Sequence, residues 1–177
     1  MRPSALAFAV VSLAASTVLA ADDNTLIADA RATIQTFKKT DPKLDKFFGS
    51  AAGYAVFPTI AKGAMVVGGA GGDGVLFVAG QPVGKSSMGQ ASIGFQLGGQ
   101  TYSEIVFFET PSALNDFKKG NFALAAQASA VALSAGAAAS AKYEKGVAIF
   151  TATKGGLMYE ASVGGQKFGY QPFASKK

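Results

Sequence analysis

The sequence predicts an α+β fold in which N-terminal helices pack on a curled, mostly antiparallel, glycine-rich β-sheet. Before Gly53, apolar residues recur at three- and four-residue steps, as in amphipathic helices; after it, short β-rich runs alternate with glycine. The chain has 22 glycines in 177 residues without a fixed period, which indicates a bent, twisted sheet rather than a repeat array. These observations leave open whether the sheet closes into a small barrel.

The first 20 residues have the pattern of a secretory signal peptide. Arg2 precedes a short uncharged run that closes on the small residue Ala20. A membrane anchor needs about 20 apolar residues, whereas this run is shorter and contains Ser12, Ser16 and Thr17. We therefore expect cleavage after Ala20, one domain over residues 21–177, and a periplasmic or secreted protein.

Composition excludes several classes of function. The chain has no cysteine and no histidine, which removes disulfides, a lipidated cysteine, histidine-based nucleophile pairs and the usual zinc ligands. The formal charge of +5 comes from scattered residues, whereas duplex nucleic acid requires clustered cations. We expect no enzymatic activity, no cofactor, no metal and no nucleic-acid partner.

Two helices are predicted near the N-terminus. Residues 22–39 carry apolar positions at helical spacing and end on Lys38 and Lys39, which suit the negative end of the helix dipole. A shorter helix follows, with Asp41 as N-cap and Pro42 at its first position. The apolar residues of the two helices are Leu26, Ile27, Ala30, Ile34, Phe37, Leu44, Phe47, Phe48 and Ala51.

Strands are predicted along most of the remaining chain. The segment 54–57 ends at Pro58, and Gly71–Gly74 reads as a hairpin turn between two short strands. A short helix is expected from Pro111 to Lys119. The alanine-rich stretch 122–141 fits a helix by propensity and a strand by its period of two, and a strand is preferred. The predicted strands are 54–57, 64–67, 75–78, 91–97, 102–109, 147–153, 157–163 and 167–170.

Catalytic and nucleotide-binding patterns are incomplete. Residues 69–74 fit G-x-G-x-x-G, but a strand follows them where a nucleotide site needs a helix. The acidic candidates Glu104, Glu109, Glu144 and Glu160 do not pair by sequence, so we expect them on a solvated rim. An enzyme would need Glu104, Glu160 and Tyr102 to converge in one cleft.

Basic and aromatic residues are the candidate binding groups. Lys62, Lys85 and Lys154 each adjoin a glycine in or near a predicted turn, where an ammonium group and free backbone N–H groups could meet one phosphate. The alternative is that they are simply solvated. On the helices, Lys38 and Lys39 could attract an anionic surface while Phe47 and Phe48 enter it, or the aromatic rings could pack in the core.

Four glycine-rich segments in order and spacing resemble the SYLF lipid-binding domain family. They are residues 53–63, 68–74, 93–100 and 154–157, and the resemblance runs from about Asp29 to the C-terminus. Two departures are Ala64, where a glycine is frequent, and Ala135–Ala137, where many members have a Gly-Pro turn with an arginine.

The resemblance implies a largely β domain that binds phosphoinositides or other anionic lipids. Some eukaryotic relatives also act on actin beside an SH3 domain, but actin is an unlikely partner for an exported chain. The leading hypothesis is thus a non-enzymatic envelope protein that binds anionic lipid head groups. The alternative is a structural or stress-related envelope protein that acts through protein–protein contacts.

Overall fold

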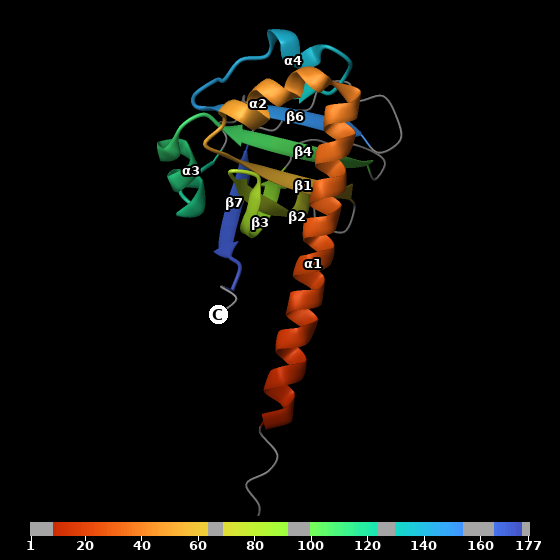
Figure 1. Ribbon diagram of the computed structural model, residues 1–177, viewed down its shortest axis with the longest axis vertical. Coiled ribbons are helices and arrows are strands. Elements are labelled where there is room, and N and C mark those ends of the chain that lie inside the picture. The colour runs from red at the N-terminus through yellow and green to blue at the C-terminus, as the bar shows by residue number, and fades with distance from the viewer. Residues whose placement is uncertain (1–8, 64–68, 92–99, 124–129, 154–164, 175–177) are drawn as a thin grey trace, which may run out of the picture.

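The computed structural model describes residues 9–63, 69–91, 100–123, 130–153 and 165–174, and it confirms the α+β class. A seven-stranded sheet carries helices on both of its faces (Figure 1). In chain order the elements are α1 (Ala9–Thr40), the 3₁₀ helix η1 (Pro42–Leu44), α2 (Asp45–Ser50), β1 (Gly53–Gly63), β2 (Gly69–Val78), β3 (Gln81–Ala91), β4 (Gln100–Phe108), α3 (Pro111–Lys118), β5 (Val131–Ala132), α4 (Ala137–Ser140), β6 (Val147–Thr153) and β7 (Gln166–Pro172).

The sheet has the strand order β5-β6-β4-β1-β2-β3-β7, and every neighbouring pair is antiparallel except β5–β6. It curls strongly, because Phe168 on the edge strand β7 lies 5.7 Å (ring centroids) from Phe57 on β1, three strands away in the sheet. The edge strands β5 and β7 do not pair in the described part of the chain. The sheet is therefore curled but open, and the possibility of a closed barrel is wrong.

Two hydrophobic cores lie on the two faces of the sheet. On one face, α1 crosses β1 and β2 and buries Ala30, Ile34 and Phe37 (Figure 1). The other face is packed by α3 through Leu114 and Phe117. The predicted amphipathic stripe of the first helix is thus a core-facing stripe, as helices of globular domains usually show.

The junction of α1, η1 and α2 follows its sequence signals closely. Asp41 has an extended backbone (φ −140°) and accepts a hydrogen bond from the Lys43 amide, while Pro42 occupies the first helical position. Thr110 caps α3 in the same way by accepting a bond from the Ala113 amide. Local capping chemistry therefore sets both helix starts.

Two sequence predictions, that β1 ends at Pro58 and that Gly71–Gly74 forms a turn, are wrong because β1 and β2 approach each other closely. Pro58 does not end β1, which continues to Gly63 through an irregularity in its pairing with β4. Gly71–Gly74 forms no turn but lies inside β2. A Cβ on Gly74 would approach the Val56 carbonyl oxygen to 2.5 Å, so glycine is required where β2 presses against the irregular part of β1.

The turn that does join β2 to β3 consists of Ala79 and Gly80. Both have positive φ, 50° and 74°, as in a type I′ hairpin. Alanine is unusual at such a position because its Cβ meets the backbone.

In its described part, the alanine-rich stretch 122–141 does not form the continuous strand that its period of two predicts. Ala123 makes an isolated bridge to Lys167 of β7, β5 contains only Val131 and Ala132, and a one-turn helix, α4, follows. The predicted strands 102–109, 147–153 and 167–170 are confirmed as β4, β6 and β7. The predicted strands 64–67 and 157–163, and most of 91–97, lie outside the described residues.

Candidate functional site

A cleft of ≈ 530 Å³ opens between the last turns of α1, the helix α2 and the turn between β2 and β3. Its size falls within the range of small-molecule sites in proteins. Apolar groups make much of its wall, and one amine lies among them. The lining includes Ile34, Lys38, Phe48, Tyr54, Val78 and Ala79.

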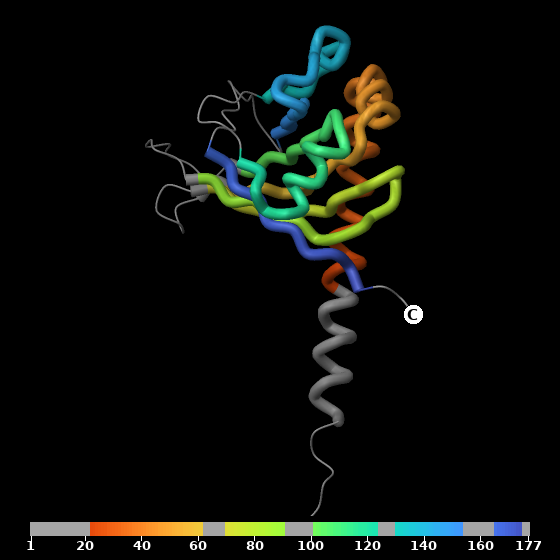
Figure 2. Tube along the Cα trace, turned by 90° about the vertical axis from the view of Figure 1, so that its left-hand side faces the viewer, coloured from red at the N-terminus to blue at the C-terminus, as the bar shows by residue number. Residues whose placement is uncertain are grey.

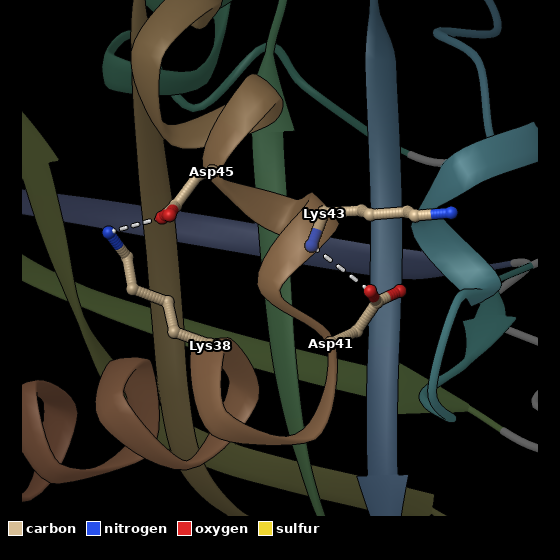
Figure 3. A network of polar contacts seen from close by, with 4 residues as sticks. All are labelled: Lys38, Asp41, Lys43 and Asp45. Carbon is tan, nitrogen blue, oxygen red and sulfur yellow. Dashed lines mark hydrogen bonds and ion pairs between the residues drawn. The ribbon is translucent and has the colours of Figure 1, made fainter.

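Lys38 is the charged group of the cleft. Its amine pairs with Asp45 at 2.8 Å and lies 4.6 Å from the centre of the Phe48 ring (Figure 3). The Lys38 side chain keeps 35% of its surface exposed, so water screens the ion pair. The cation is thus positioned at the cleft wall yet remains open to a second anionic group.

The two neighbouring phenylalanines of α2 have different surroundings. Phe47 is 2% exposed and packs against Phe107 and Phe150 in the core. Phe48 is only half-buried, lines the cleft, and meets Tyr54 edge to face at 5.0 Å. Of the two rings expected at a membrane, only Phe48 is placed where a ligand could touch it.

Tyr54 provides a neutral polar group in the cleft wall. Burial raises the pKa of its hydroxyl, and the positive charge of Arg31 opposes that rise only in part. The hydroxyl therefore stays protonated at neutral pH and can donate a hydrogen bond to a ligand.

Three more lysines lie close to the cleft in the sequence, between the end of α1 and α2. Lys39 and Lys43 are exposed, and the Lys43 amine extends toward α4 (Figure 3). Lys46 is held more firmly, because its amine donates to the carbonyl oxygens of Ala139 and Ala141 at 3.3 Å each. Figure 2 shows α2 and α4 together above the sheet, so these cations share one end of the protein.

Lys85 does not lie at a turn, contrary to the prediction. It is in the middle of β3 and pairs with Asp73 of β2 at 2.9 Å. The hydrogen bond to Asp73 raises the pKa of Lys85, and the charges of Asp23 and Asp22 add to the effect. Since its amine is already paired with Asp73, Lys85 is poorly placed to attract a phosphate.

Of the two remaining predicted lysines, only Lys62 can be placed, at the end of the sheet away from the cleft. The backbone of Lys62 pairs with Ala70 and Gln100 near the end of β1, and its side chain lies outside the described part. Lys154 also lies outside it, directly after the last residue of β6. The structure thus joins Lys38 and Phe48 in one cleft and assigns Lys62 and Lys85 elsewhere.

The expectation that all four glutamates form a solvated rim is wrong for Glu104. Glu109 and Glu144 are exposed, and Glu160 lies outside the described residues, but Glu104 is 0% exposed. A signal was available, because Glu104 alternates with Tyr102, Val106 and Phe108, which all point to one core.

Two other kinds of feature, a metal site and a membrane-spanning helix, are absent from the described ranges. Those residues hold no group of three or more metal-ligating side chains. Among them, no helix has the length and apolar character needed to cross a membrane.

The comparison with known families gives one match. Residues 89–172, from within β3 to the end of β7, match the family model Ysc84, described as "Las17-binding protein actin regulator". No curated protein matches the chain.

Proposed function

The chain belongs to the Ysc84 (SYLF) family through residues 89–172, and from this premise we propose that it is a non-enzymatic protein that binds anionic lipid head groups at the cell envelope. The predicted signal peptide supports a site of action outside the cytoplasm, in the periplasm or beyond. The description of the family supports a binding role, because it names a binding partner and no reaction.

The observation that carries the proposal is the cleft beside α2. Its wall combines the half-buried ring of Phe48, the neutral hydroxyl of Tyr54 and the amine of Lys38. An anionic amphiphile presents the complementary set, namely a charged oxygen group next to hydrocarbon. Lys39 and Lys43, exposed on the same segment, would add attraction to an anionic membrane surface.

Vesicle flotation tests this proposal. The purified protein should float with vesicles that contain anionic phosphatidylglycerol and remain behind with neutral phosphatidylcholine vesicles, and added salt should weaken recruitment. The double variant Lys38→Gln/Lys39→Gln should bind about ten-fold more weakly, since each cation near a charged surface contributes about 1 kcal/mol and Asp45 already offsets part of Lys38.

A matched control lies in α3. Lys118 and Lys119 are also consecutive lysines at the end of a helix, but α3 packs on the opposite face of the sheet. Lys118→Gln/Lys119→Gln changes the net charge equally and should leave recruitment nearly unchanged. Equal losses in the two double variants would mean that only net charge matters, and the cleft would then have no role.

The alternative function is binding of a protein partner. The family description favours it, because it names Las17 binding. It predicts that recruitment is indifferent to lipid charge and that one protein co-purifies in constant ratio. Flotation with anionic vesicles alone, without any other protein, argues against this alternative.

A further inference from the structure

A second polar site lies inside the curled sheet, on the face opposite α1 and away from the cleft. Glu104 and Gln166 are 0% exposed, and Tyr102 and Thr151 are 1% exposed. They come from three strands, β4, β6 and β7, and the same face also carries the buried polar residues Ser86 and Gln90 of β3 among its apolar side chains. We call these four residues the inner polar cluster.

The members of the cluster contact one another across the interior. Gln166 donates a hydrogen bond from Nε2 to Oε2 of Glu104 at 3.1 Å, although β1, β2 and β3 separate their strands in the sheet. A further hydrogen bond joins the Gln166 side chain to Tyr102. Thr151 lies directly opposite Glu104 in the pairing of β4 with β6.

Without a bound group, the inner polar cluster would destabilise the folded protein. Burying a carboxylate costs several kcal/mol even when it is well paired. In addition, Oε1 of Gln166 and Oγ1 of Thr151 are buried without a hydrogen-bond partner in the structure, and an unmet buried polar group costs about 1–3 kcal/mol. Apolar side chains would serve stability better, so the cluster indicates a bound group.

The chemistry of the cluster selects the kind of group. The carboxyl group of Glu104, the amide oxygen of Gln166 and the hydroxyl oxygen of Thr151 are hydrogen-bond acceptors gathered at one place. A primary ammonium group offers three N–H donors and a positive charge, and it is small. We propose that the inner polar cluster binds a primary ammonium group, either free or at the end of a lipid head group.

Thermal unfolding of the full chain tests this inference with methylammonium chloride, using tetramethylammonium chloride at equal ionic strength as the control ion. Methylammonium should raise the Tm by several degrees in a saturable way, because it binds only the folded state. Tetramethylammonium has no N–H donor and should not. Parallel binding to vesicles with and without phosphatidylethanolamine separates a free amine from a lipid head group.

Three variants sharpen the test. Thr151→Val keeps the side-chain shape and should weaken methylammonium binding at least ten-fold, and Glu104→Gln should abolish it. Ser86→Ala is the control, since Ser86 is also 1% exposed with an unpartnered hydroxyl, but it lies opposite Tyr170, farther along β3 and β7. It should bind methylammonium like the unmodified protein.

Two outcomes would overturn the inference. One is the absence of any Tm change with either ion, which would mean that water alone fills the site, or an equal Tm change with both ions, which would mean a general effect of salt. The other is unchanged methylammonium binding in both Thr151→Val and Glu104→Gln. Neither outcome affects the flotation test of the cleft, because the two sites share no residue.

Discussion

Asp41 connects the N-terminal helices to a segment almost one hundred residues later. Its carboxylate is buried and accepts hydrogen bonds from the amides of Ala138 at 2.6 Å and Lys43 at 3.1 Å. These bonds, the one from Ala138 first, lower the pKa of Asp41 below its ordinary value of 3.8, against the opposing effect of burial. The charged form therefore stabilises the fold.

The lowered pKa of Asp41 predicts how the stability of the fold depends on pH. Because the folded-state pKa is depressed, the stabilisation by Asp41 is complete above the unfolded-state pKa near 3.8 and is lost as the pH falls through the lower folded-state value. Asp41→Asn should lower the Tm at pH 7 and flatten the fall of Tm below pH 4. Parallel curves for the two proteins from pH 7 to pH 3 would contradict this.

Ala79 is strained at the edge of the cleft. Its φ of 50° is costly for any residue with a Cβ, and asparagine tolerates this region better than alanine. Ala79→Asn should raise the free energy of unfolding by about 0.5–1 kcal/mol. Gly80→Ala should lower it by about 1 kcal/mol, through φ alone, because no atom lies within 4 Å of the added Cβ. Urea unfolding measures both values.

At the scale of elements, the glycines of β2 decide whether β1 and β2 can pair. Gly72 and Gly74 face the irregular stretch of β1, and a Cβ on either would meet a β1 carbonyl oxygen, that of Thr59 or Val56. Close approach of backbones, rather than a turn, explains this part of the glycine-rich sequence.

Two alanine substitutions test that explanation. Gly74→Ala should cost about 3 kcal/mol or more, because the new methyl would lie 2.5 Å from the Val56 carbonyl and 2.6 Å from the Phe57 ring. Gly89→Ala, in the middle of β3 with nothing within 4 Å, should be neutral or slightly stabilising. Similar losses for both in chemical denaturation would rule out the close-approach explanation.

At the scale of the whole molecule, one segment contacts both edges of the curled sheet. Ala123 bridges to Lys167 of β7, and Val131 pairs with Phe150 of β6. These two backbone pairings and the Glu104–Gln166 hydrogen bond across the interior stabilise the curled shape of the sheet. The curl keeps the inner polar cluster together, while the helices that form the cleft pack on the outer face.

The signal-peptide prediction is also tested on the whole molecule. Among the α1 side chains that the structure describes, Leu26, Ile27, Ala30, Ile34 and Phe37 pack against the sheet, and all of them follow Ala20. A chain that begins at Ala21 should therefore unfold within about 2 °C of the full chain, and the mass of the exported protein should correspond to cleavage after Ala20. A fall of the Tm by about 5 °C or more would show that the earlier residues support the fold.

Local physics made much of the fold predictable. Caps such as Asp41 and Thr110 mark helix starts because they satisfy the first amides, and alternating apolar residues mark β4 and β6 because one strand has two faces. The sequence also singled out Lys38 and Phe48, which the structure brings into one cleft.

By itself, the sequence determined the starts of η1 and α3, the core-facing stripe of α1, the strands β4, β6 and β7, and the resemblance to the SYLF family. Only the tertiary structure decided that Gly74 lies in a strand, that Phe47 packs inside while Phe48 faces the cleft, and that Lys85 lies among carboxylates. It also decided that Glu104 is buried beside Gln166. The physical reason is that these features depend on how strands far apart in the chain approach one another as the sheet curls, which no local pattern encodes.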